Sequence, residues 1–241
     1  MGLILAGLLV DRLGHQGLFS FLVLISIVLW LMSGYLLIET KPNNLTPIPL
    51  WPLATCMFND GKIWRCAILI ACFNLMLFGY YSLAPFIFSE LSLSVLVFGY
   101  SGIVLAFGTL LGSLRNKKLL MLGWQEKGLT LMASCLAMVG AIGVATLQTS
   151  LAFLIPMIAV VISFGIAILN ILSSAIDDYK AMVGSAGALL GLTYYLLLGL
   201  SLLLASLIHD LGFVLLAAST VSLIVSIVQT RKAANLVDHT I

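Results

Sequence analysis

The chain has 241 residues, of which 62% are hydrophobic and only 8% are charged, and its mean hydropathy is +1.20. Soluble domains carry about 25% charged residues, so this composition excludes an ordinary soluble protein. The formal net charge is only +2 and no basic patch accompanies it, which excludes a nucleic-acid-binding protein. The sequence contains no cluster of His, Cys, Asp or Glu with catalytic or ligand spacing, so we expect no enzyme, no metal and no cofactor.

Long stretches without a charged residue predict membrane-spanning helices. A helix needs about 20 apolar residues to cross the hydrocarbon core. Helices are favoured over strands because every backbone polar group must be paired within the bilayer, and these stretches do not alternate as barrel strands do. One stretch is long enough for two spans, which we divide near Gln148, Thr149 and Ser150. Seven spans follow, in residues 16–38, 66–89, 91–114, 128–176, 181–208 and 211–230.

The first residues differ from a complete span. Residues 1–10 are apolar, and Asp11-Arg12-Leu13-Gly14 then interrupts them before the span at 16–38. Ten helical residues reach across only about half a bilayer. We therefore expect that the chain lacks its natural N-terminal part; a reentrant or amphipathic N-terminal segment is the alternative.

Lysine and arginine predict the orientation of the spans. Ten of the eleven lie in loops on one side of the predicted membrane, and Arg12 lies on the other. Because basic loops stay in the cytoplasm, we place this side and the C-terminal tail on the cytoplasmic side of the bacterial inner membrane.

A proline-rich segment divides the spans into two unequal groups. Residues 39–64 carry Pro42, Pro47, Pro49 and Pro52 and predict a cytoplasmic central linker. Residues 1–38 would then end one transporter half, residues 65–232 would form a C-terminal half of six spans, and residues 233–241 would form the tail.

Three stretches carry a resemblance to a known family: Gly2–Phe19 with Glu39-Thr40-Lys41-Pro42, Tyr81–Leu120, and Val183–Gly191. In these stretches the chain resembles the major facilitator superfamily, and within it the Bcr/CflA (bicyclomycin/chloramphenicol resistance) group of drug:proton antiporters. The resemblance implies the C-terminal six-helix half of such a bundle, preceded by one full span and a partial span. It also implies multidrug efflux by alternating access, with helices 1 to 4 of the family and part of helix 5 absent.

Polar and aromatic residues within the spans are candidates for a substrate cavity. An apolar cavity with few hydrogen-bonding groups suits a lipophilic small molecule. For the two asparagines, hydrogen bonding between helices is an equal alternative, and for Pro85 a fixed bend is. The candidates are Asn74, Tyr81, Ser82, Pro85, Asn170, Ser173, Tyr194 and Tyr195.

Glycines at helical spacing predict close packing between helices, and these are Gly108, Gly112, Gly184, Gly187 and Gly191. All nine acidic residues lie at the ends of the apolar stretches, so the sequence contains no evident carrier for a proton gradient. The alternative function is therefore a non-transporting membrane protein, or an inactive relic of a transporter. In either case the lipid bilayer is the expected surrounding.

Overall fold

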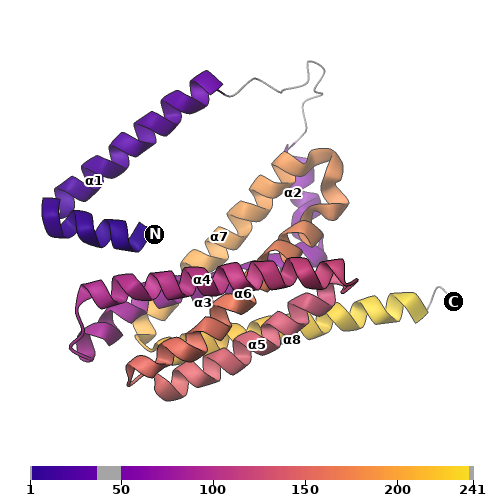
Figure 1. The fold of residues 1–241 in the computed structure, drawn as a ribbon. Helices are drawn as coiled ribbons and strands as arrows, with labels where there is room; N and C mark the ends of the chain where they lie inside the picture. The colour runs from indigo at the N-terminus through magenta and orange to yellow at the C-terminus, as the bar shows by residue number, and fades with distance from the viewer. Residues whose placement is uncertain (1, 37–49, 239–241) are drawn as a thin grey trace.

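The computed structural model describes residues 2–36 and 50–238, and this part of the chain is built from helices and short connections (Figure 1). Its long helices are α1 (Gly2–Leu36), α3 (Gly61–Glu90), α4 (Val95–Met121), α5 (Glu126–Leu147), α6 (Leu154–Ile176), α7 (Val183–Ile208) and α8 (Leu211–Asp238). Three shorter elements are α2 (Leu50–Asn59) and the 3-10 turns η1 (Leu151–Phe153) and η2 (Asp177–Met182).

The predicted spans are confirmed as helices. Six apolar helical stretches are long enough to cross a membrane, and the one over Leu151–Ile208, 58 residues long, contains both α6 and α7. The division predicted at Gln148–Ser150 is confirmed, because α5 ends at Leu147 and η1 begins at Leu151. The described part of the chain is therefore all-α, with enough long apolar helices for a multi-pass membrane protein.

The break predicted near residue 14 is also present. Within α1 the backbone at Gly14 has φ 67° and ψ −177°, which interrupts the helix. Glycine tolerates a positive φ because it has no Cβ. The helix continues through Leu13, so the interruption is a single residue rather than the four-residue turn that the sequence suggested.

The predicted linker contains more helix than expected. Residues 37–49 lie outside the described part, but α2 occupies Leu50–Asn59 and α3 begins at Gly61, four residues before the predicted start at 65. Pro52 is compatible with α2 because it lies in the first turn, where amide groups have no helical acceptor. Asp60 caps α3 by accepting a hydrogen bond from the Lys62 amide at 2.7 Å. At the other end, α8 runs to Asp238, into the predicted tail.

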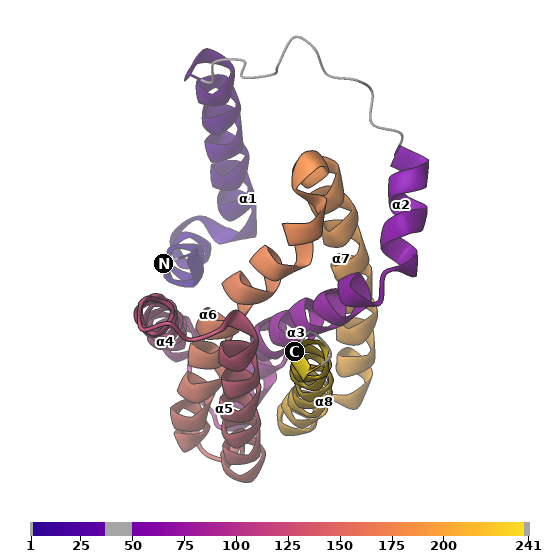
Figure 2. The same cartoon turned by 90° about the vertical axis from the view of Figure 1, so that its right-hand side faces the viewer.

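Four helices form a closed ring around the core. In it α3 packs on α6, α6 on α5, α5 on α8, and α8 returns to α3. Two helices flank the ring: α4 packs mainly on α6 and α7 mainly on α3, on opposite sides of the bundle (Figure 2). The part of α1 that touches the bundle lies against α4, and its span Gln16–Leu36 is not buried at all.

Small residues bring the helix backbones together. The Cα atoms of Gly112 on α4 and Gly165 on α6 lie so close that a Cβ at Gly112 would meet the Ile162 carbonyl and lie 3.1 Å from the Gly165 Cα. Gly140 on α5 lies against Pro156 and Val160 of α6 in the same way. Lipid tails are as apolar as leucine, so close packing of this kind drives helix association in a bilayer.

The five predicted packing glycines divide into two groups. Gly108 and Gly112 lie at the crossing of α4 and α6. Gly184 and Gly187 have nothing within 4 Å of a built Cβ, and Gly191 has only Tyr194 of its own helix, at 4.0 Å. These three therefore do not mark a contact between the described helices, because they lie away from the face by which α7 packs on α3.

Buried polar side chains add hydrogen bonds between helices. Asn170 on α6 donates to the Asn116 side-chain oxygen on α4 at 2.8 Å and to the Ile166 carbonyl at 2.8 Å, and Asn116 donates back to Asn170 at 3.4 Å. Both amides are 3% exposed. The Ser134 hydroxyl on α5 lies 2.9 Å from that of Ser226 on α8. In an apolar interior such pairs satisfy groups that would be costly to leave unpaired.

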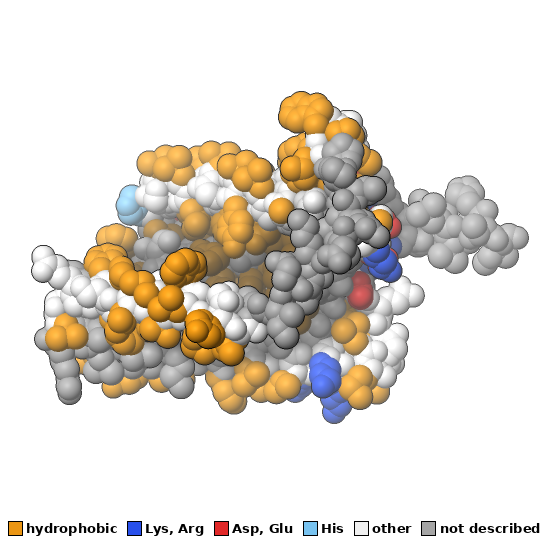
Figure 3. Space-filling model, turned by 90° about the horizontal axis from the view of Figure 1, so that it is seen from above, with side chains coloured by type: hydrophobic (Ala, Val, Ile, Leu, Met, Phe, Trp, Pro, Cys, Tyr) orange, Lys and Arg blue, Asp and Glu red, His pale blue; other side chains and the backbone are white. Residues whose placement is uncertain are grey.

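Charged side chains gather toward one end of the bundle, and hydrophobic side chains cover much of the rest of the face seen in Figure 3. We call this the basic end. Its basic side chains come from the starts of α3 and α5, the ends of α4 and α8, and η2. They are Lys62, Arg65, Arg115, Lys117, Lys118, Lys127, Lys180 and Arg231.

Replacing Gly112 by alanine should destabilise the bundle by about 1–3 kcal/mol, because the new Cβ meets backbone atoms of α6 that cannot move aside. Thermal unfolding of the purified protein in mild detergent measures the effect. Gly187→Ala is the matched control and should leave the melting temperature unchanged or slightly higher, because its Cβ enters open space and alanine favours a helix. Equal melting temperatures for the two variants would contradict the assigned contact.

The Asn116–Asn170 pair should show energetic coupling in a double-mutant cycle. Asn116→Leu or Asn170→Leu alone leaves one buried amide without its partner, at a cost of about 1–3 kcal/mol. The double substitution should cost less than the sum of the two single substitutions, by about 0.5–2 kcal/mol. Additive losses in the same detergent unfolding assay would show that the amides do not interact.

Candidate functional site

The structure does not bring the eight candidate cavity residues into one pocket. Four lie on α3, two on α6 and two on α7. They form three groups with different surroundings: an uncovered face of α3, a groove at the basic end, and the outward side of α7.

The uncovered face of α3 is a stripe along an otherwise enclosed helix. The most apolar window of α3 is 67% buried, more than that of any other candidate span in the described part. At spacings of three and four residues, however, Asn74 is half-buried, Phe78 is 41% exposed, and Ser82 and Pro85 are exposed. Residues at this spacing share one helical face. This α3 stripe carries Asn74, Phe78, Ser82 and Pro85.

Hydrogen-bonding groups are available along the α3 stripe. The Asn74 side chain donates to the Ile70 carbonyl at 2.8 Å, which leaves its oxygen free to accept. Pro85 has no amide hydrogen, so the carbonyl of Tyr81, four residues earlier, lacks its helical donor. The stripe is therefore mostly apolar, with an amide, a hydroxyl and a backbone carbonyl spaced along it.

Tyr81 belongs to an aromatic cluster next to this stripe. It is half-buried, and its ring lies edge-on to Tyr80 with centroids 5.5 Å apart. Tyr80 is fully buried, and its hydroxyl lies 2.5 Å from the Ser101 hydroxyl of α4. Phe98 and Phe153 pack on Tyr80 with centroids 6.2 and 6.3 Å away. The cluster fixes α3 against its neighbours, and Tyr81 lies at its edge.

Tyr194 and Tyr195 lie on α7. Their ring centroids are 4.4 Å apart, but Tyr195 is 61% exposed while Tyr194 is half-buried. Thr193, their neighbour, is on the buried side of the helix. The structure therefore places Tyr195 on the outward side of α7, away from the ring.

The groove at the basic end contains the two remaining candidates. It has a volume of about 720 Å³ and lies where α4 ends and α5 begins, against α6. Four apolar residues line it: Leu114, Leu120, Met121 and Leu169. Its polar lining consists of Ser113, Asn116, Lys117, Glu126, Asn170 and Ser173. We call this the lateral groove.

Sequence reasoning missed the partners of Asn170 and Ser173 in this groove. Asn116 bonds to Asn170, and Ser173 donates a hydrogen bond to Glu126 Oε1 at 3.3 Å. Asn116 lies within the Tyr81–Leu120 stretch that carries the family resemblance, but nothing in the sequence indicates that it pairs with Asn170. Glu126 opens α5 and resembled an ordinary first-turn acid.

A second, polar hollow adjoins the lateral groove. It has a volume of about 310 Å³ and is lined by Lys62, Glu126, Lys127, Ser173, Ser174 and Asp177. Glu126 and Ser173 therefore belong to both hollows. We call this the polar hollow.

Ion pairs hold the walls of the polar hollow in place. Lys62 on α3 bonds to Asp178 at 2.6 Å, and Lys180 bonds to Asp177 at 2.7 Å. Tyr179, between them in η2, donates to the Asp60 carboxylate at 3.2 Å. The α6–α7 turn is thereby attached to the start of α3.

These contacts shift the pKa values of three side chains in η2, the turn between the spans formed by α6 and α7. The hydrogen bond from Lys180 and its positive charge lower the pKa of Asp177, and the same contact raises the pKa of Lys180. Burial, together with the hydrogen bond to Asp60, raises the pKa of Tyr179. All three groups keep their usual charge at neutral pH.

At the opposite end, polar groups close the turn between α7 and α8. Asp210 caps α8 by accepting from the Phe213 amide at 2.8 Å, and Gln148, which follows α5, accepts from the Gly212 amide at 3.0 Å. Glu90 and His209 line a hollow of about 320 Å³ beside them. The bonded groups there serve the helix ends.

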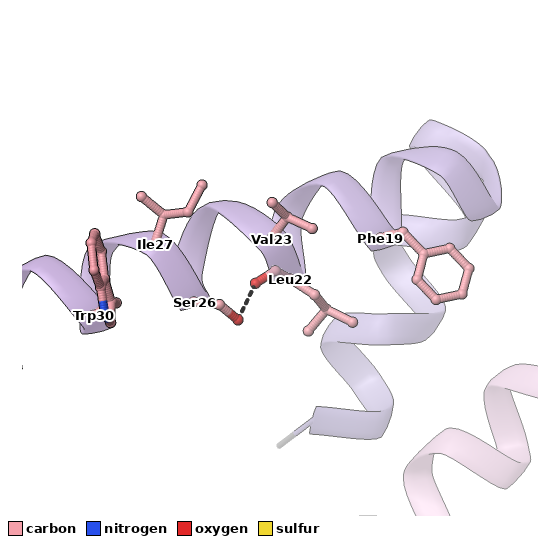
Figure 4. Close-up of a pocket in the computed structure, with 6 residues that line it drawn as sticks. All are labelled: Phe19, Leu22, Val23, Ser26, Ile27 and Trp30. Carbon is pink, nitrogen blue, oxygen red and sulfur yellow. Dashed lines mark hydrogen bonds between the residues drawn. The ribbon is translucent and has the colours of Figure 1, made fainter.

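An apolar hollow also lies along the unburied span of α1 (Figure 4). Phe19, Leu22, Val23, Ile27 and Trp30 line it, and Ser26 bonds to the Leu22 carbonyl of its own helix at 2.8 Å. The serine hydroxyl is thus satisfied within the helix. This surface is a side of a span rather than a site with chemistry of its own.

Comparison with known proteins identifies relatives of this chain. The chain is 24% identical over 226 residues to an "Uncharacterized transporter" of Rickettsia bellii (strain RML369-C), covering 87% of this chain and 56% of that protein. It is 26% identical over 194 residues to an "Uncharacterized transporter" of Rickettsia felis (strain ATCC VR-1525 / URRWXCal2), covering 69% of this chain and 46% of that protein. The chain thus spans about half the length of these relatives.

A family model also matches most of the chain. Residues 1–202 match the sequence model of the Major Facilitator Superfamily, from the first arm of α1 into α7. This match covers most of the described helices, and the family points to a role in transport rather than catalysis. The chain belongs to the Major Facilitator Superfamily.

Proposed function

We propose that this chain forms part of an exporter of lipophilic compounds, of the Bcr/CflA drug:proton antiporter group, in a bacterial inner membrane. In this proposal residues 65–232 act as the C-terminal half, and residues 1–38 end the preceding half. The basic end and the C-terminus face the cytoplasm, in agreement with the positive-inside distribution of Lys and Arg. The relatives, both described as transporters, support a transport role.

The α3 stripe carries the proposal. A helix packed on several neighbours has no structural need to keep an amide, a hydroxyl and a proline-freed carbonyl on its one uncovered side. A mostly apolar surface with one aromatic ring and few hydrogen-bonding groups fits lipophilic molecules better than sugars, which need many polar contacts. We assign Asn74, Ser82 and Pro85 to this chain's share of the substrate pathway, with Tyr81 at its border.

In this proposal the group that couples export to the proton gradient is not one of the described carboxylates. The carboxylates whose side chains the structure describes lie at helix ends or in turns: Asp60, Glu90, Glu126, Asp177, Asp178 and Asp210. A proton carrier inside the membrane has to be a titratable group within a span. We therefore expect it in the portion of full-length relatives that this chain does not match.

An accumulation assay tests the export function. The chain is joined to the portion of a full-length relative that it does not match and is produced in a bacterial host lacking its own drug exporters. Uptake of a fluorescent lipophilic cation is then measured with and without a protonophore. We expect lower accumulation in producing cells and loss of the difference with protonophore. The double variant Asn74→Leu and Ser82→Ala should raise accumulation several-fold, because each lost polar contact weakens binding by about 1 kcal/mol.

Ser206→Ala is the matched control, because Ser206 is exposed near the end of α7 and bonds only to the Leu203 carbonyl of its own helix. It should accumulate as little dye as the unchanged chain. Accumulation in producing cells equal to that in empty cells, together with no saturable flux in proteoliposomes, would favour the non-transporting membrane protein instead.

A further inference from the structure

The lateral groove and the polar hollow form one amphiphilic site at the basic end. Glu126 and Ser173 line both, and the hydrogen bond between them, 3.3 Å from Oγ to Oε1, forms their shared wall. One side of this wall is mainly apolar and the other is charged. A ligand that occupies both sides must itself have an apolar part and a charged part.

The apolar side opens toward the surface that faces lipid. Leu114 and Leu169 are each 56% exposed, and Met121 is more exposed still. Leu114 and Leu169 lie within the predicted spans, where we expect the surrounding medium to be hydrocarbon, and Met121 is the last residue of α4. The groove, at about 720 Å³, is within the range of cavities that bind small molecules.

The polar groups in the floor of the groove are already hydrogen-bonded and need no polar contact from a ligand. Asn116 and Asn170 are both 3% exposed and already bond to each other and to the Ile166 carbonyl. An acyl chain can lie over this pair without leaving an amide unsatisfied, because the amides satisfy one another. The floor is therefore compatible with hydrocarbon.

The charged side presents both signs of charge. Lys62 and Lys127 provide ammonium groups, Glu126 and Asp177 provide carboxylates, and Ser173 and Ser174 provide hydroxyls. Lys62 pairs with Asp178 of η2, and Asp177 pairs with Lys180 within η2. A purely anionic group would meet two carboxylates here, and a purely cationic group would meet two lysines. A zwitterion satisfies both.

We propose that this site binds a zwitterionic phospholipid of the bilayer whose headgroup carries a phosphate and a primary ammonium. The phosphate contacts Lys127 and Lys62, the ammonium donates to Glu126 and the serine hydroxyls, and one acyl chain lies in the lateral groove. Basic pockets between spans are suited to lipid headgroups, and charge-assisted hydrogen bonds give the specificity. This proposal does not depend on the proposed export function.

Native mass spectrometry of the detergent-purified chain tests the lipid class without any substitution. The protein is titrated with phosphatidylethanolamine, phosphatidylcholine and phosphatidylglycerol of identical acyl chains. We expect phosphatidylethanolamine to bind about tenfold more tightly, because a trimethylated ammonium cannot donate hydrogen bonds and a glycerol headgroup has no cation. Equal affinity for all three lipids would overturn the proposal, as would preference for phosphatidylglycerol.

Substitutions locate the site. Glu126→Gln keeps an acceptor for Ser173 and should remove the preference for phosphatidylethanolamine over phosphatidylcholine, while Lys127→Gln should weaken the binding of both. Lys118→Gln is the matched control, because Lys118 is exposed at the same end of α4 and lines neither hollow. If Lys118→Gln weakens binding as much as Lys127→Gln, diffuse charge explains the affinity and the site is wrong.

Two further measurements test the role of the groove. Leu169→Trp should fill the apolar side and lower the affinity of every diacyl lipid without changing a charge. Water-soluble phosphoethanolamine should fail to displace the bound lipid at millimolar concentration, because it lacks the acyl chain. Displacement by phosphoethanolamine would assign the polar hollow to free headgroup compounds and overturn the lipid assignment.

Discussion

The backbone contact between Gly112 and Gly165 is the constraint on which the α4–α6 side of the bundle depends. In a bilayer the removal of apolar side chains from lipid provides no driving force, so two helices stay together only if their surfaces match closely. Here the match is backbone against backbone. Asn116 lies one turn beyond Gly112, and Asn170 lies five residues beyond Gly165, so this crossing brings the two amides within hydrogen-bonding distance. The two amides that form the floor of the lateral groove can therefore meet because Gly112 and Gly165 have no Cβ.

The closed ring of α3, α5, α6 and α8 explains why the α3 stripe is unusual. The ring surrounds α3 with α6 and α8, and α7 covers a further side. What remains uncovered is a narrow row of positions along α3. A polar group placed anywhere else on α3 would need a partner within the core, whereas a group on this row remains available to a molecule that arrives later. Because the other sides of α3 are enclosed, polar groups on this row stay accessible while those elsewhere on the helix are covered.

The spans were predictable because their signal is local. A charge-free run of sufficient length has one stable form in a bilayer, and the polar Gln148–Ser150 group divided the longest run correctly. The glycine contacts were not predictable in the same way. Gly108 and Gly112 have the same spacing as Gly187 and Gly191, yet only the first pair meets another helix. Spacing shows which residues share a face, but not which face meets a neighbour.

Site residues showed the same limit. Asn170 was identified as a costly polar group, but its partner Asn116 lies 54 residues away in the sequence, and only the folded arrangement pairs them. Likewise, α2 was hidden by a proline that happens to occupy a first helical turn. The asparagine pairing depends on a tertiary contact, whereas α2 depends on where the proline lies within its own helix.

The contact of α8 with both α3 and α5 has a consequence for biosynthesis. Because α8 is synthesised after α3, α5 and α6, the ring stays open until translation reaches α8. Until then α3, with its polar stripe and the buried Cys66 and Cys72, has one side without its final neighbour. Insertion machinery or a chaperone in the membrane would have to shield that side for the whole time needed to synthesise about 120 residues from the end of α3 to the start of α8, a period of roughly 6–24 s at bacterial elongation rates of about 5–20 residues per second.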